Sequence, residues 1–269
     1  MSLIIAAAQS TSIPGDISRN AAHHLRFGTM AAEHGAQLLI FPELSLTGYE
    51  LPIARSNAVR SDSSDLDSLQ HLATHAHMTV VVGAPVLNHK NELHIAALAI
   101  RPDGSVSTYT KEHIHQSEEE VFTPGSGGPA LLVEDATVAL AICADATHPQ
   151  HAASAAASGA NVYAVGVMID ENGYPRKVAL LRNYALEHRM AVLMANYSGA
   201  TGGSVSAGKS ALWSEDGHLV AATTGNEEAL IVGSKQNGAW NGIVLPLSLP
   251  STTSSQVAHQ RSAQLTSPG

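Results

Sequence analysis

The apolar and polar positions of the chain follow two periods, and this predicts a mixed α/β protein. Short apolar runs typical of buried strands recur along the chain, and stretches with helical spacing lie between several of them. The runs that predict strands cover residues 3–8, 37–41, 78–83, 93–100, 105–110, 137–142, 161–167, 191–195, 210–214, 218–223 and 228–233. The stretches that predict helices cover residues 18–34, 64–77, 150–158 and 176–189. Asp103-Gly104 and Glu215-Asp216-Gly217 are turn signals between neighbouring strands.

The single cysteine of the chain, Cys143, ends one of these apolar runs. The residues after it are polar and lead into the alanine-rich stretch that predicts the helix at 150–158. Cys143 is therefore expected at a strand-to-helix turn, where backbone N–H groups can favour a thiolate. A lone buried cysteine more often serves packing. Two other segments favour a chemical role instead.

Two charged residues also follow predicted strands. Glu43 comes directly after the strand ending in Phe41-Pro42, and Lys111 comes at the end of the strand after the Asp103-Gly104 turn. Open α/β sheets place their ligand crevices at the carboxyl ends of strands. A thiol, a carboxylate base and a cation form a set suited to acyl transfer, although isolated Glu and Lys residues are more often solvated. Strand-end spacing alone does not prove that the three converge.

Four short segments together resemble the nitrilase superfamily of carbon–nitrogen hydrolases. The segments are Phe41-Pro42-Glu43, Tyr109-Thr110-Lys111-Glu112-His113-Ile114, Phe122-Thr123-Pro124-Gly125 and Ile142-Cys143-Ala144-Asp145. Each is weak alone, but their order and separations together are specific, and the resemblance covers about residues 2–235. It implies a four-layer α-β-β-α sandwich, with residues 1–247 as one carbon–nitrogen hydrolase domain. Residues 248–269 are rich in Ser, Thr, Gln and Pro and are expected to form an extended or disordered tail.

The resemblance also implies roles for individual residues. Cys143 would be the nucleophile, Glu43 the general base, Lys111 an oxyanion donor and Glu118 a second glutamate. Glu119 and Glu120 adjoin Glu118, so which of the three faces the site stays open. The residues expected to contact substrate are Tyr49, His113, Ala144 and His148. Ala144 departs from the bulky residue usual in the family, which bears on substrate identity. Its backbone N–H can still donate to an oxyanion.

These observations favour a hydrolase that cleaves a small non-peptide amide or N-carbamoyl compound through a cysteine thioester. A nitrile is the less expected substrate, because most members of the family act on amides. The alternative is a catalytically impaired ligand-binding or interaction protein on the same fold. A third reading, a thiol redox sensor, would need a resolving cysteine from another molecule. The family resemblance also implies a homo-oligomer, at least a dimer.

Composition narrows the class of protein further. The chain has 269 residues, 44% of them hydrophobic, and a formal net charge of −9 without a basic stripe, which argues against nucleic acid and anionic membranes as partners. No apolar run reaches the ~18 residues of a transmembrane helix. One cysteine and an N-terminus without a cationic leader fit a cytoplasmic protein.

The fifteen histidines raise the question of a metal site. His71 and His75 lie one helical turn apart, and His113, His115, His148 and His151 lie near the candidate site. No zinc-binding signature or cysteine pair accompanies them. We therefore expect solvated or core-edge histidines, with no metal and no cofactor.

Overall fold

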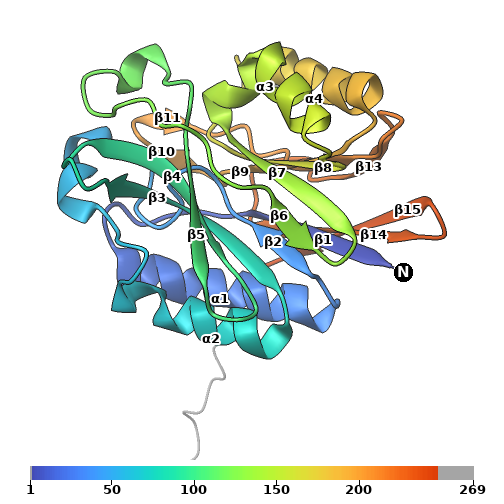
Figure 1. Ribbon diagram of the computed structural model, residues 1–269, viewed down its shortest axis with the longest axis horizontal. Coiled ribbons are helices and arrows are strands. Elements are labelled where there is room, and N and C mark those ends of the chain that lie inside the picture. Colours follow the sequence, from blue (N-terminus) through green and yellow to red (C-terminus); the bar gives the residue numbers. More distant parts are fainter. Residues whose placement is uncertain (1, 248–269) are drawn as a thin grey trace, which may run out of the picture.

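Two β-sheets packed face to face form the centre of the molecule in this computed structural model, which describes residues 2–247. The seven-stranded sheet has the order β15-β14-β1-β2-β3-β4-β5, and the six-stranded sheet has the order β13-β12-β9-β8-β7-β6. Helices α1 (Ile17–Glu33) and α2 (Asp67–Ala76) cover the outer face of the first sheet. Helices α3 (Pro149–Ala157) and α4 (Tyr174–His188) cover the second (Figure 1). This is the α-β-β-α sandwich that the sequence predicts.

The strands of the first sheet begin at the N-terminus and close with the last described segment. They are β1 (Leu3–Gln9), β2 (Leu38–Ile40), β3 (Thr79–Leu87), β4 (Leu93–Ile100), β5 (Val106–Thr110), β14 (Ala229–Gln236) and β15 (Ala239–Pro246). Neighbours β1, β2 and β3 run parallel, whereas β4, β5, β14 and β15 pair antiparallel.

The second sheet has a parallel centre and antiparallel flanks. Its strands are β6 (Leu131–Val133), β7 (Ala136–Ile142), β8 (Val162–Val167), β9 (Ala191–Asn196), β12 (Ala211–Trp213) and β13 (Leu219–Ala222). Strands β7, β8 and β9 run parallel. A separate small hairpin joins β10 (Ala200–Thr201) to β11 (Ser204–Val205).

Burial on both faces explains why the strands have nearly continuous apolar sequences. In β1, Ile5 and Ala7 pack into the core between the two sheets, while Ala6 and Ala8 pack beneath α1 and α2. A strand covered on both sides has no polar face to interrupt its pattern. Small side chains in these positions allow the layers to approach closely, which fits the low aromatic content of 4%.

The structure confirms the predicted helices and strands, with shifts at their ends. The helix predicted at 64–77 begins with a 3-10 turn, Ser64–Leu66, before α2. Strands β6, β10, β11 and β15 were not predicted. The tail predicted for residues 248–269 lies outside the described residues.

Candidate active site

Glu43 lies in a tight loop that follows β2 and enters the space between the sheets. Two glycines, one in a strand of each sheet, make room for this loop. A Cβ atom at Gly83 of β3 would lie 2.2 Å from the backbone nitrogen of Leu44, and one at Gly166 of β8 would lie 2.8 Å from the carbonyl oxygen of Phe41. Any side chain at either position would push the loop away. The position of Glu43 therefore depends on glycine, which has no side chain, at both Gly83 and Gly166.

Lys111 lies directly after β5 and its ammonium joins two carboxylates. Its Nζ donates to Glu43 Oε1 at 2.6 Å and to both oxygens of Glu118 at 2.7 Å. All three side chains are buried, with at most 1% exposed. Glu118 belongs to a 3-10 turn, Gln116–Glu118, whereas Glu119 and Glu120 are exposed to solvent. The structure thus identifies Glu118 as the glutamate that faces the cluster.

The two carboxylates differ in how fully their oxygens are bonded. Besides Lys111, Glu118 accepts hydrogen bonds from the Tyr49 hydroxyl at 2.6 Å and the backbone N–H of His115 at 2.8 Å. Glu43 Oε2 is buried and has no hydrogen-bond partner among the described residues. A buried oxygen without a partner is costly and rare, so this one is available for a ligand or a proton.

Charge in this cluster is unbalanced, since two carboxylates share one ammonium. Burial, the largest effect, raises the pKa of Glu43 to about 7, with Lys111 opposing this and Glu118 adding to it. Burial also acts against the charge of Lys111, but Glu43 and the other negative groups around it raise its pKa above the ordinary value. The ammonium therefore stays charged, and Glu43 is the group that can exchange a proton near neutral pH.

Cys143 lies at the end of β7, where a 3-10 turn, Cys143–Thr147, begins. Its φ angle is +39°, a left-handed conformation that is strained for a residue with a side chain. Such strain is typical of nucleophiles held at a sharp strand-to-helix turn. The sulfur is 3.6 Å from the carbonyl oxygen of Met168, in the loop after β8.

Asp145 joins this turn to the segment that carries Lys111. Its carboxylate accepts from the backbone N–H groups of Ile142 at 3.0 Å, Glu112 at 3.1 Å and His113 at 2.8 Å. It also accepts from the Tyr109 hydroxyl at 2.8 Å. These hydrogen bonds connect the end of β7, which carries Cys143, to the end of β5, which carries Lys111.

Lys177, which sequence reasoning missed, also reaches the candidate nucleophile. Its ammonium donates to Cys143 Sγ at 3.3 Å from the first turn of α4. Burial raises the pKa of Cys143 and Glu43 raises it further, whereas Lys177 and Lys111 lower it. The sequence led us to expect a turn that favours the thiolate, but in the free protein burial outweighs the two cations.

The four predicted substrate-contacting residues fall into two groups. Tyr49 contacts Glu118, and Ala144 is buried beside Cys143 in the same turn. His113 and His148 stack on each other, with ring centres 3.8 Å apart, on the Asp145 side of the turn. Within residues 2–247 no three His, Cys, Asp or Glu side chains are grouped to hold a metal ion, and no helix is long and apolar enough to cross a membrane.

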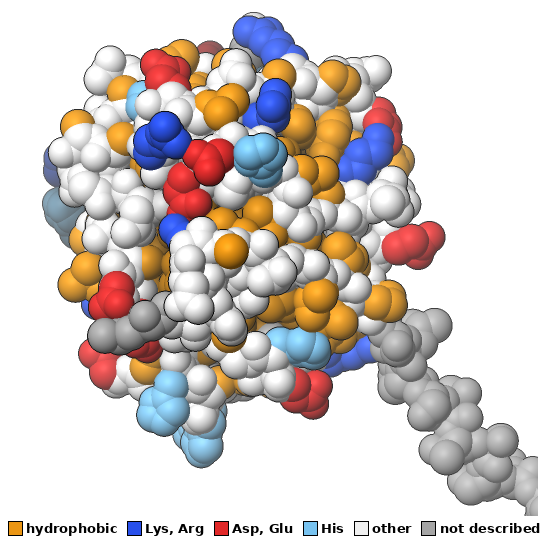
Figure 2. Space-filling view, turned by 90° about the vertical axis from the view of Figure 1, so that its right-hand side faces the viewer, with side chains coloured by type: hydrophobic (Ala, Val, Ile, Leu, Met, Phe, Trp, Pro, Cys, Tyr) orange, Lys and Arg blue, Asp and Glu red, His pale blue; other side chains and the backbone are white. Residues whose placement is uncertain are grey.

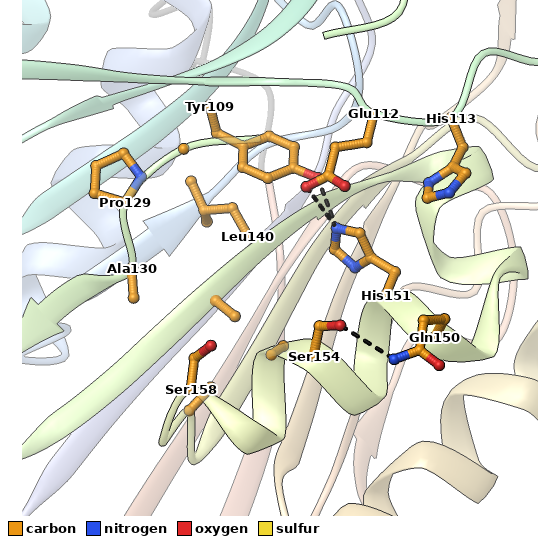
Figure 3. A pocket seen from close by; sticks show the side chains of 14 residues that line it. Tyr109, Glu112, His113, Pro129, Ala130, Leu140, Gln150, His151, Ser154 and Ser158 are labelled. Carbon is orange, nitrogen blue, oxygen red and sulfur yellow. Dashed lines mark hydrogen bonds and ion pairs between the residues drawn. The ribbon is translucent and has the colours of Figure 1, made fainter. Parts of the chain in front are cut away.

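A cavity of about 390 Å³ lies behind the 3-10 turn Cys143–Thr147 rather than over the Cys143 sulfur. Tyr109, Glu112 and His151 point toward one another at its wall, and Ser154 and Gln150 line it from α3 (Figure 3). His151 contacts the hydroxyls of Tyr109 and Tyr163, each at 2.8 Å, and burial lowers its pKa. The polar groups of this wall hydrogen-bond to one another, and the Tyr109 hydroxyl also donates to Asp145. The cavity wall therefore supports the Cys143–Thr147 turn.

Comparisons with known proteins match the fold of this chain. The amidase from Nesterenkonia sp. AN1 superposes with a TM-score of 0.78 and 26% identity over 86% of this chain and 92% of that one, in a mutant with acrylamide added to its active-site cysteine. Another mutant of that amidase, in complex with butyramide, matches over 86% and 89% of the chains with the same TM-score.

Sequence relatives point the same way. A Staphylococcus aureus protein described as a hydrolase in the agr operon is 24% identical over 83% of this chain and 87% of its own length. An (R)-stereoselective amidase from Pseudomonas sp is 27% identical over 69% of this chain and 68% of its own length. The sequence profile of the carbon-nitrogen hydrolase family matches residues 4–240. The chain therefore belongs to the carbon–nitrogen hydrolase family of the nitrilase superfamily.

Proposed function

We propose that this protein hydrolyses a small non-peptide amide or N-carbamoyl compound through a thioester at Cys143. The observation that carries the proposal is the buried Oε2 of Glu43, which has no hydrogen-bond partner within residues 2–247, in a cluster whose other acceptors are bonded. A general base needs a free lone pair and a pKa near the working pH. Burial supplies the second of these by raising the pKa of Glu43 to about 7.

In the proposed reaction, Glu43 takes the thiol proton as the sulfur attacks the amide carbon. The carbonyl electron pair moves onto the oxygen, and a tetrahedral intermediate forms. Glu43 then gives the proton to the nitrogen, the C–N bond breaks, and ammonia or an amine leaves. Water, deprotonated by Glu43, attacks the thioester, and the acid departs as the thiol regains its proton.

Two donors would hold the oxygen that becomes negative. One is the Lys111 ammonium, which both neighbouring carboxylates fix in place. The other is the backbone N–H of Ala144, which follows the strained nucleophile. Donors fixed before the reaction need not reorganise as charge develops, and each is typically worth about 100- to 1000-fold in rate.

The amide preference is supported by relatives. The Nesterenkonia protein is an amidase seen with butyramide, and the Pseudomonas relative is an (R)-stereoselective amidase. A panel of simple aliphatic amides, ω-amides and N-carbamoyl amino acids, assayed by ammonia release, would define the substrate class.

The proposal predicts that Cys143→Ala and Cys143→Ser abolish hydrolysis with little change in melting temperature. The side chain is small, so its loss removes the nucleophile and leaves the turn intact. We expect kcat below about a thousandth of the wild-type value, and an acyl adduct on Cys143 of the wild type by mass spectrometry. A protein that binds amides yet forms neither ammonia nor adduct would instead be the impaired ligand-binding alternative.

A further inference from the structure

A second ammonium group, besides that of Lys111, lies close to the Cys143 sulfur. The Lys177 ammonium lies 3.3 Å from Cys143 Sγ, and its side chain is half-buried. The charged groups acting on this sulfur are Glu43, Lys111 and Lys177, from the loop after β2, the end of β5 and the start of α4. The Glu43–Lys111–Glu118 cluster alone has one positive and two negative groups. A thiolate formed beside it would need a further positive charge.

The position of Lys177 does not serve its own helix. It lies in the first turn of α4 after Arg176, and that turn has no acidic residue. Cations at a helix N-terminus are unfavourable because they oppose the helix dipole. Arg176 is exposed and can stay in water, whereas Lys177 is turned inward onto the sulfur. Lys177 thus occupies a position that is unfavourable for the helix, and its ammonium is directed at the reacting sulfur. Together these two observations indicate a role in catalysis.

We propose that Lys177 is a catalytic residue that stabilises the thiolate of Cys143, while Lys111 stabilises the oxyanion. This inference rests on the proposed function. As the thiol proton passes to Glu43, negative charge appears on the sulfur beside the Lys177 ammonium. The charge then leaves the sulfur as the S–C bond forms, and Lys177 keeps its proton throughout. The two lysines thus act on different atoms at successive moments.

The test measures the reactivity of the thiol without any turnover. The rate of Cys143 alkylation by iodoacetamide, a neutral probe, is followed against pH in wild type, Lys177→Met and Lys177→Arg. We expect Lys177→Met to raise the apparent pKa of the thiol by about one unit, which lowers alkylation about tenfold at pH values below it. Lys177→Arg, which keeps the charge, should restore part of the rate.

Lys209→Met provides the matched control. Lys209 also lies near the start of α4, but its ammonium pairs with Glu171 at 2.7 Å rather than with the sulfur. The Lys209→Met variant should leave the pH dependence of Cys143 alkylation unchanged. Identical profiles for wild type and Lys177→Met would overturn the inference. So would a defect confined to the KM of carboxylate-bearing amides, which would make Lys177 a substrate-binding residue.

Failure of the proposed function would look different. In that case Cys143 of the wild type would resist iodoacetamide across the pH range and no amide in the panel would release ammonia. The inference would then fall together with the proposed function. A reactive wild-type thiol with an unchanged Lys177→Met profile would overturn the role of Lys177 alone.

Discussion

At the scale of single residues, the two glutamates around Lys111 differ in their remaining bonding capacity. Both oxygens of Glu118 are occupied by Lys111, and Tyr49 and the His115 backbone add one hydrogen bond to each. Glu43 keeps one oxygen without a partner among the described residues. We therefore propose different tasks for two carboxylates that share one charge partner. Glu118 would fix the position of Lys111, and Glu43 would move protons.

This difference predicts the effect of Glu43→Gln on activity. The wild-type rate should rise with pH through about 7, as the raised pKa of Glu43 is passed and its base form accumulates. Gln keeps the shape but cannot accept the proton, so kcat should fall about 100- to 10,000-fold. Steady-state rates across pH provide the measurement. Tyr49→Phe, which removes one hydrogen bond to Glu118, is the milder comparison.

The same raised pKa has a consequence for stability that needs no substrate. Between the ordinary pKa of Glu, 4.5, and about 7, the folded protein binds a proton that the unfolded chain has lost. The contribution of Glu43 to the free energy of unfolding is therefore full below this window and is lost as pH rises through it. Glu43→Gln should remove this slope in denaturant titrations from about pH 5 to about pH 8. Equal slopes in both proteins would contradict the raised pKa.

At the scale of elements, the position of the Glu43 loop depends on two glycines in strands that would otherwise favour larger residues. At Gly83, an added Cβ would lie 2.2 Å from the backbone of Leu44, and backbone cannot yield as a flexible side chain can. Gly83→Ala should therefore destabilise the fold by about 1–3 kcal/mol and lower kcat, because the loop carrying Glu43 must shift. Gly225→Ala is the control, since its Cβ would meet no atom of the described part of the chain within 4 Å. Equal melting temperatures and rates for the two variants would refute this account.

The sequence predicts most elements because their apolar runs are long and buried on both faces. It also places Glu43, Lys111 and Cys143 at strand ends, but their convergence depends on which strands become neighbours. Lys177 could not be assigned, because each helical residue turns by about 100° and the helix begins at Tyr174 rather than at 176. The sequence does contain a turn signal for the hairpin that includes strand β15. Asn237-Gly238, with φ angles of +49° and +82°, forms the two-residue turn between β14 and β15.

At the scale of the whole molecule, some of the exposed apolar side chains lie on strands at sheet edges. Leu132 of β6 is 78% exposed, Leu219 of β13 is 59% exposed and Ile243 of β15 is 46% exposed. Each of these strands is an outermost strand of its sheet within residues 2–247. Figure 2 views the molecule from the β14–β15 side and shows hydrophobic side chains gathered there among charges of both signs. Large exposed apolar patches can mark contacts with another protein molecule.

The exposed edges therefore support the prediction of a homo-oligomer, at least a dimer. Light scattering should give a mass that is a multiple of the 27.9 kDa chain at micromolar concentration. A lysine at an apolar edge would have to lose water on assembly, so Ile243→Lys should reduce the mass if β15 is part of the contact, and Leu219→Lys should do so if β13 is. Because neither residue contributes to the candidate site, each variant should keep its thiol reactivity toward iodoacetamide as long as the fold is intact. A wild-type protein that scatters only as a single chain would show that these edges stay exposed to water and that the prediction is wrong.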